Sequence, residues 1–206
     1  MEYLDPKFIV ESLGIIGVVS IVFAESGLFF GFFLPGDTLL FTAGLLASQN
    51  YINIYLLVVL TSIAAILGDS VGYAFGKKVG PKIFSKEDSL FFNKKHIERS
   101  QKFFEKYGKK SLILARFTPI VRTFTPILAG VGKMPYKEFI TYNIIGGIAW
   151  VFSMSLLGFF FGKIIPNPDK YILPIIAVII ILSIAPGIWE FIKERNKQKN
   201  EIRINQ

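Results

Sequence analysis

Arg116-Phe117-Thr118-Pro119-Ile120-Val121-Arg122, followed by Pro126, is the stretch that decides the fold, because it sets two cations and two prolines in an apolar run. A second interrupted stretch begins at Glu25 and reaches Pro35-Gly36-Asp37. An ionisable group at bilayer depth is costly and is found mainly where it faces a protein interior or a water-filled cavity. Two acids and two arginines on proline-interrupted segments therefore predict a transport site.

The composition is that of an integral membrane protein. The 206 residues are 52% hydrophobic, with a mean hydropathy of +0.51, 21 Phe and 18 Gly, which is too apolar for an ordinary soluble domain. Residues 139–162 carry no charge and residues 51–76 and 171–192 carry one acid each, so all three are long enough to span. A fourth apolar run begins at Phe8, and we interpret it as a retained membrane helix rather than a signal peptide.

Two residue types that dominate enzyme chemistry are almost missing. The chain has no cysteine and one histidine, His96. Disulfides, thiol catalysis, zinc sites built from Cys or His and histidine-based acid–base chemistry inside the membrane are therefore excluded. We expect no metal or other cofactor and no enzymatic activity.

Lysine and arginine are unevenly distributed, which predicts the orientation through the positive-inside rule. Residues 77–110 hold eleven of them and the tail from Lys193 holds five, so both regions should be cytoplasmic. Three apolar segments lie between them, and three crossings would place the tail outside. We predict that residues 111–132 enter from the cytoplasm and return, because a broken segment is tolerated at membrane depth when protein or a cavity surrounds it.

The same reasoning predicts an outer re-entrant hairpin at residues 27–47, with Pro35 and Gly36 as its breaks and Pro119 and Pro126 as the breaks of the inner hairpin. The expected fold is an all-α integral membrane protein with about four transmembrane helices and two oppositely oriented re-entrant hairpins that form an inverted repeat. The single membrane domain, residues 1–206, would comprise a helix at 8–26, the outer hairpin at 27–47, a helix at 51–76, a basic cytoplasmic amphipathic segment at 77–110, the inner hairpin at 111–132, helices at 136–162 and 171–192, and a cytoplasmic tail at 193–206.

An internal comparison at an offset of 86 residues supports the repeat. It aligns Ala43-Gly44 with Ala129-Gly130, Gly72 with Gly158, and Phe75-Gly76-Lys77 with Phe161-Gly162-Lys163. Inverted repeats with broken helices are common in secondary transporters. The alternative is chance similarity between glycine-rich apolar helices.

The chain resembles the DedA family of bacterial membrane proteins, also called the SNARE-associated Golgi protein family, over roughly residues 10–165. The matching residues are Glu25, Phe32-Phe33-Leu34-Pro35-Gly36-Asp37, Gly68-Asp69-Ser70-Val71-Gly72-Tyr73, Gly76, Gly80, the segment from Arg116 to Pro126, Ala129-Gly130, Met134, Phe139, Asn143, Gly146 and Trp150. The resemblance implies a plasma-membrane transporter of polyprenyl phosphates or phospholipids, with proton coupling proposed for several members. It also implies that Glu25, Asp37, Arg116 and Arg122 are functional.

Several roles are open for the charged residues. Arginine suits phosphate because its planar fork donates two hydrogen bonds, and a break at Pro119 would let Arg116 and Arg122 turn toward one anion. Glu25 and Asp37 would pair with the arginines or take up protons when a phosphate arrives. The alternative is that the ion pairs only lock two hairpins together. Asp69 is expected in a supporting position, with a structural hydrogen bond or a role in proton exit.

The expected partners follow from these features. They are membrane lipid phosphates, protons and the anionic lipids of the inner leaflet, which would attract the basic segment at 77–110. We expect no nucleic-acid partner, and the sequence leaves a homo-oligomeric state open. The expected location is the bacterial plasma membrane, with several crossings and a cytoplasmic C-terminus.

Proton-coupled transport of undecaprenyl phosphate across the plasma membrane, for recycling, is the predicted function. A flippase or scramblase for phospholipids such as phosphatidylethanolamine is the alternative, because arginine recognises both kinds of phosphate. A lipid-phosphate enzyme is the rival from another class, and the chain lacks the membrane-facing histidines that such an enzyme would use.

Overall fold

The computed structural model describes residues 6–28, 34–83 and 108–164, and all the regular structure in them is helical. The predicted helix at 171–192, the tail at 193–206 and most of the basic segment at 77–110 lie outside the described residues. The elements are α1 (Pro6–Gly27), α2 (Gly36–Ser48), α3 (Ile54–Ile83), η3 (Gly108–Lys110), α5 (Ser111–Leu114), η4 (Ala115–Phe117), α6 (Pro119–Val131) and α7 (Tyr136–Ile164).

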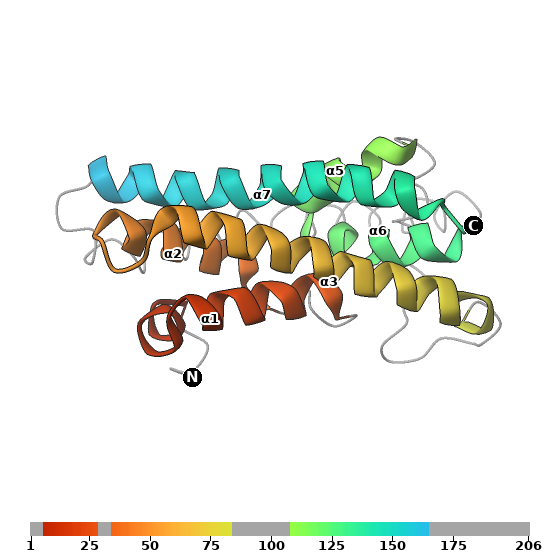
Figure 1. The fold of residues 1–206 in the computed structure, drawn as a ribbon, viewed down its shortest axis with the longest axis horizontal. Coiled ribbons are helices and arrows are strands. Elements are labelled where there is room, and N and C mark those ends of the chain that lie inside the picture. Colours follow the sequence, from red (N-terminus) through yellow and green to blue (C-terminus); the bar gives the residue numbers. More distant parts are fainter. Residues whose placement is uncertain (1–5, 29–33, 84–107, 165–206) are drawn as a thin grey trace, which may run out of the picture.

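Two long apolar helices, α3 and α7, form the frame of the molecule. They contain 30 and 29 residues, or about 45 Å each at about 1.5 Å per residue. The most apolar 18-residue window has a mean hydropathy of 2.1 within Ile54–Lys78 and 2.0 within Tyr136–Ile164, so both helices are long and apolar enough to cross a bilayer core of about 30 Å. They run in opposite directions (Figure 1). α7 covers the predicted span 136–162, and α3 begins three residues after the start of the predicted span 51–76.

Two short helices, α2 and α6, begin where the sequence places its prolines. Each has 13 residues, which is about 20 Å and too short to cross. Pro35 caps α2, and Pro119 is the first residue of α6, where its missing N–H costs nothing. Because α2 leads directly into α3 and α6 leads directly into α7, the two short helices run in opposite directions and their N-termini face the middle of the molecule (Figure 1).

Pro126 does not act as predicted. It was expected to break the inner hairpin, but α6 continues through it to Val131. A proline inside a helix removes one backbone hydrogen bond, and the surrounding turns are otherwise kept. The reversal of the inner hairpin instead occurs at Thr118, whose extended backbone (φ −126°, ψ 104°) is the conformation that a following proline favours.

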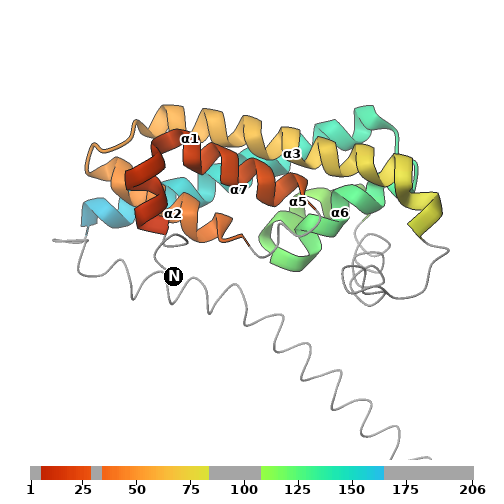
Figure 2. The same ribbon diagram turned by 90° about the horizontal axis from the view of Figure 1, so that it is seen from below.

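Helix α1 differs from the predicted spanning helix at 8–26. It is interrupted at Gly14, whose φ of 57° and ψ of −152° are non-helical values that glycine adopts most readily. Its C-terminal Gly27 packs against the backbone of Gly68, in the middle of α3, with a closest approach of 3.1 Å from its ideal Cβ position. Both views show α1 beside the first half of α3 only (Figures 1 and 2). α1 and α2 therefore lead into and out of the middle of the molecule.

Each short helix packs tightly against a long helix, with glycine at the contacts. Gly44 of α2 lies against the backbone of Ser155, and Gly130 of α6 lies against the backbone of Tyr73. In the reverse direction, Gly158 of α7 meets the Phe41 carbonyl and Gly76 of α3 meets the Ile127 carbonyl. A side chain at any of these four glycines would collide with backbone.

These contacts revise the predicted internal alignment. The short-helix partners, Phe41 with Ile127 and Gly44 with Gly130, are 86 residues apart, as predicted. The long-helix partners are 82 apart, so Gly158 corresponds to Gly76 by its contacts and not to Gly72. A gapless comparison could not show this, because it holds one offset along both elements.

The glycines of α3 give a stability prediction with an internal control. A Cβ at Gly76 would overlap the Ile127 carbonyl, whereas a Cβ at Gly72 would meet its nearest atoms at 3.7 Å, an ordinary contact. We expect Gly76→Ala to destabilise the protein by about 1–3 kcal/mol through overpacking. Gly72→Ala should be neutral or stabilising by up to about 1 kcal/mol, because alanine favours helix. Thermal unfolding in detergent measures both, and equal midpoints for the two variants would contradict the packing.

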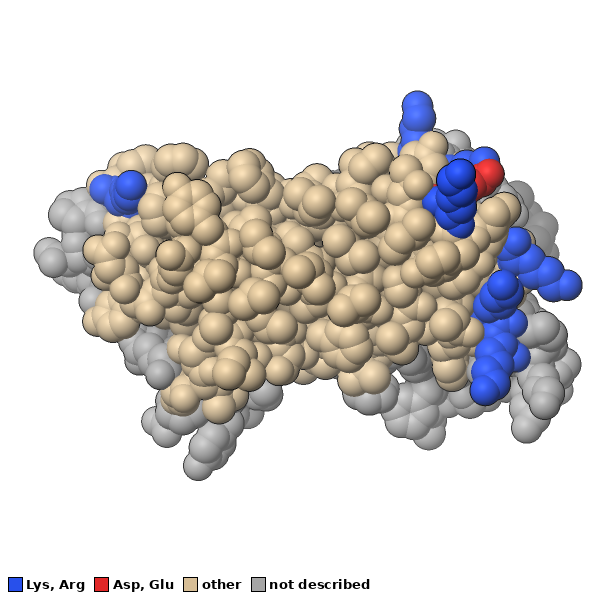
Figure 3. Space-filling view, viewed as in Figure 1, with Lys and Arg blue, Asp and Glu red and all other residues tan. Residues whose placement is uncertain are grey.

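The exposed charges of the described residues lie at the ends of the molecule. The face seen in Figure 3 is uncharged between them, with most of the lysines at one end. The exposed lysines are Lys77, Lys78, Lys109, Lys110, Lys133 and Lys137 on elements that meet at that end, and Lys163 at the opposite end of α7. An uncharged band flanked by charged ends is the surface expected of a chain that crosses a membrane.

Candidate functional site

Five charged side chains meet in the middle of the molecule, where α1 ends and where α2 and α6 begin. They are Glu25, Asp37, Asp69, Arg116 and Arg122. Glu25 is 1% exposed, Arg116 3% and Asp69 6%. Groups this deeply buried keep their charge only when partners compensate it, so their contacts define the site.

Arg122 joins three elements through one guanidinium group. Its Nη1 donates to Oδ1 of Asp37, on α2, at 2.8 Å, and its Nη2 donates to Oε1 of Glu25, on α1. The other Glu25 oxygen, Oε2, is buried and has no hydrogen-bond partner among the described residues. This arrangement uses the guanidinium fork to bridge two carboxylates, which a lysine could not reproduce.

Arg116 makes a separate centre. Its Nη2 donates to Oδ2 of Asp69, on α3, and to Oδ1 of Asn143, on α7. Asn143 in turn donates from Nδ2 to the Ile66 carbonyl at 3.0 Å, which fixes the orientation of its amide. Gly147, one turn after Asn143, lies beside the guanidinium, and a Cβ added there would meet Nη2 at 3.5 Å, an ordinary contact.

Asp69 thus lies closer to the site than the sequence indicated. We expected a supporting carboxylate with a backbone partner or a role in proton exit, and its observed partner is the Arg116 side chain. Conversely, the two guanidinium groups do not face a common anion. Each guanidinium faces its own carboxylates, because Arg116 lies on η4 before the Thr118 reversal and Arg122 lies after it on α6.

Trp150 links the two centres. Its indole Nε1–H donates to Asp37 Oδ1 at 2.7 Å, and its ring centre lies 4.9 Å from Arg122 Cζ and 5.9 Å from Arg116 Cζ. Trp150 was predicted to have no role beyond its place in the family resemblance. The spacing of Asn143, Gly147 and Trp150 could have indicated one, because residues four and seven apart share a helix face.

Gly36 was predicted as a hairpin breaker, and the structure adds a second reason for glycine there. A Cβ at Gly36 would overlap the Glu25 carboxylate. Glycine therefore allows the start of α2 to approach the acid closely, which brings the positive end of the helix dipole to a negative charge.

The charges of the site nearly balance. Three carboxylates face two guanidiniums, and the N-termini of α2 and α6 each add about half a positive charge. In the part of the chain that the structure describes, no group of three or more His, Cys, Asp or Glu side chains could hold a metal ion.

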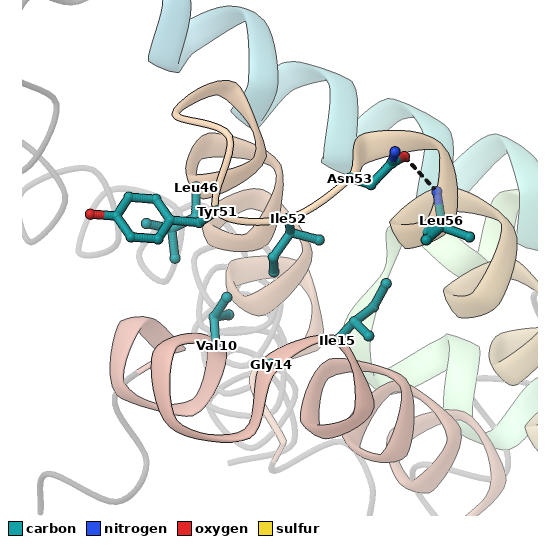
Figure 4. Close-up of a pocket in the computed structure, with 8 residues that line it drawn as sticks. All are labelled: Val10, Gly14, Ile15, Leu46, Tyr51, Ile52, Asn53 and Leu56. Atoms are coloured by element: carbon teal, nitrogen blue, oxygen red, sulfur yellow. Dashed lines mark hydrogen bonds between the residues drawn. The ribbon is translucent and has the colours of Figure 1, made fainter.

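A pocket of about 340 Å³ lies away from these charges. Figure 4 shows it between the start of α1, the end of α2 and the start of α3, with mainly apolar side chains around it. Asn53 borders it and caps α3, accepting from the Leu56 N–H at 3.2 Å. None of the predicted site residues lines this pocket.

Comparison with known proteins identifies the family. The VTT domain matches residues 34–165. The chain is also 46% identical over 177 residues to Protein DedA of Escherichia coli, covering 85% of this chain and 80% of that protein. The chain belongs to the DedA family of membrane proteins.

Other DedA relatives come from mycobacteria. An uncharacterized membrane protein of Mycobacterium tuberculosis is 41% identical over 91% of this chain and 85% of its own length. One from Mycobacterium leprae is 37% identical over 98% of this chain and 94% of its own length. No solved structure matches. The DedA matches indicate a membrane location and no enzyme family, and the VTT domain contains four of the five site charges, with Glu25 before it.

Proposed function

We propose that this DedA protein transports a polyprenyl phosphate carrier such as undecaprenyl phosphate across the bacterial plasma membrane for recycling. The observation that carries the proposal is the burial of two guanidiniums in the middle of the molecule, where two short helices present their N-termini. Guanidinium groups and helix N-termini both bind phosphate. In transporters, broken helices of this kind commonly form the substrate site.

The proposed membrane arrangement is an inverted repeat. One unit would be the α1–α2 hairpin with α3, and the other the 111–132 hairpin with α7. The opposite directions of α2 and α6 support it, as does the matching pair of glycine contacts. Lys77, Lys133 and Lys137 would then face the cytoplasm with Lys163 outside, in accord with the positive-inside rule.

The carboxylates would make the transport proton-coupled. Without cargo they pair with the arginines, and a phosphate that takes their place leaves buried acids that are stable only when protonated. Since the site is close to neutral, a monoester carrying two negative charges should be accompanied by two protons and a diester by one. Proton and lipid movement can be measured together in proteoliposomes with an entrapped pH dye. The same proton-to-lipid ratio for both lipids would contradict this coupling.

The direct test of the function is translocation of labelled undecaprenyl phosphate in proteoliposomes at two imposed pH gradients. We expect movement that depends on the protein, responds to the gradient and is competed by unlabelled monoester more strongly than by phosphatidylethanolamine. Stronger competition by phosphatidylethanolamine would favour a phospholipid flippase. Release of inorganic phosphate by the purified protein would favour an enzyme. Protein-free vesicles are the control.

A further inference from the structure

Two hydrogen-bond donors converge on a single oxygen at the centre of the site. Asp37 Oδ1 accepts from Arg122 Nη1 at 2.8 Å and from Trp150 Nε1 at 2.7 Å. The donors come from α6 and α7, and the acceptor comes from α2. This oxygen therefore occupies a binding position formed by one charged donor and one neutral donor.

The indole N–H of Trp150 needs a hydrogen-bond acceptor because it is buried. Trp150 is 1% exposed, and a buried N–H that loses its acceptor costs about 1–3 kcal/mol. If Asp37 leaves Arg122, the indole N–H needs another acceptor at the same place. An oxygen of any anion that replaces the carboxylate on Arg122 would lie within its reach.

We propose that Trp150 is a phosphate-binding residue, and that Asp37 Oδ1 occupies the position which a lipid phosphate oxygen takes during transport. The proposal rests on the proposed function, because it assigns a further ligand to that phosphate site. Nε1–H and Arg122 Nη1 together donate to the phosphate.

The indole ring has a second part in this exchange. It lies within 6 Å of both guanidinium carbons, at 4.9 Å and 5.9 Å, a range in which a cation is attracted to the ring face. The ring therefore retains an attraction for both arginines while their carboxylate partners leave. It keeps Arg122 in place between its two anions.

The test must separate a direct contact from an effect through Asp37. In the wild type the indole N–H has an acceptor with or without cargo, so its removal changes affinity little. In Asp37→Ala no carboxylate occupies this position before binding. Removal of the N–H therefore costs the whole hydrogen bond between the indole and the phosphate. The experiment therefore compares Trp150 with benzothienylalanine, which has sulfur in place of the N–H and nearly the same shape, in both backgrounds. Trp150→Phe is a second variant.

Binding of farnesyl phosphate to the purified protein is measured by calorimetry, with farnesol and inorganic phosphate as separate arms. In Asp37→Ala, removal of the N–H should weaken binding about tenfold or more, since a hydrogen bond to a charged group contributes about 1.5–3 kcal/mol. Farnesyl phosphate should bind at least tenfold more tightly than inorganic phosphate, and farnesol should not compete with it. Unchanged thermal midpoints check the fold.

Each contrary binding result would overturn a specific claim. Equal affinities with and without the N–H in Asp37→Ala, where binding still needs Arg122, overturn the role of Trp150 and leave the proposed function intact. Equal affinities for farnesyl phosphate and inorganic phosphate overturn the assignment to a lipid. Absence of phosphate binding by the wild type overturns both this inference and the proposed function.

Discussion

Replacement of Arg122 by alanine is expected to abolish polyprenyl phosphate transport in proteoliposomes. The side chain bridges Glu25 and Asp37 in the structure. In the proposed function it is also the main hydrogen-bond donor to the lipid phosphate. Loss of charge-assisted hydrogen bonds worth about 1.5–3 kcal/mol each would lower the rate by about tenfold to a hundredfold per bond. Arg122→Lys should lie between, because lysine keeps the charge but lacks the planar fork.

The alanine variant also leaves Glu25 buried without a partner, which can destabilise the fold by about 3–5 kcal/mol. A companion variant, Arg122→Ala with Glu25→Gln, removes that unpaired charge and should restore the thermal midpoint without restoring transport. Lys137→Ala, an exposed lysine far from the site, is the matched control and should transport normally. Transport at the wild-type rate by a folded Arg122 variant would refute the proposed phosphate site.

The second large effect is expected at the pair formed by Arg116 and Asp69. Either single change, Arg116→Met or Asp69→Leu, leaves a buried charge without its partner and should destabilise the protein by about 3–5 kcal/mol. The double variant should recover most of that stability, because apolar side chains of similar size can replace a buried ion pair. Thermal unfolding in detergent measures the recovery.

Transport by the double variant decides between the two roles left open for Arg116. A folded double variant that moves no lipid would show that transport needs the charges of this pair beyond their effect on stability. If the double variant transports normally, the ion pair serves only to hold α3 against η4, and the phosphate site is reduced to Arg122 and its neighbours.

The sequence predicted the elements whose signals are local. Uninterrupted apolar runs indicated α3 and α7, and Pro35 and Pro119 marked the starts of α2 and α6, because proline restricts its own backbone and that of the residue before it. The break in α1 was not predicted. Gly14 lies in an apolar run that could equally have formed a straight helix, so the sequence pattern does not mark the break.

The sequence predicted which residues form the site better than it predicted which of them contact one another. Burial cost alone singles out Glu25, Asp37, Arg116 and Arg122. The partnership of Arg116 with Asp69, 47 residues away, depends on how α3 and η4 approach each other, and nothing local encodes that distance. Trp150 was assigned no role in the site, because a tryptophan in an apolar helix needs no polar partner to explain its presence.

The glycine contacts have a mechanical consequence. They clamp α2 to α7 and α6 to α3 backbone against backbone, so each pair would move as a rigid body. The joint between the two bodies is crossed by polar contacts, from Arg122 to Asp37 and from Arg116 to Asn143. Such contacts can be exchanged for contacts with another anion, whereas interlocked backbones cannot. Under the proposed function, these charges would hold the two rigid pairs of helices together until the cargo phosphate replaced the carboxylates.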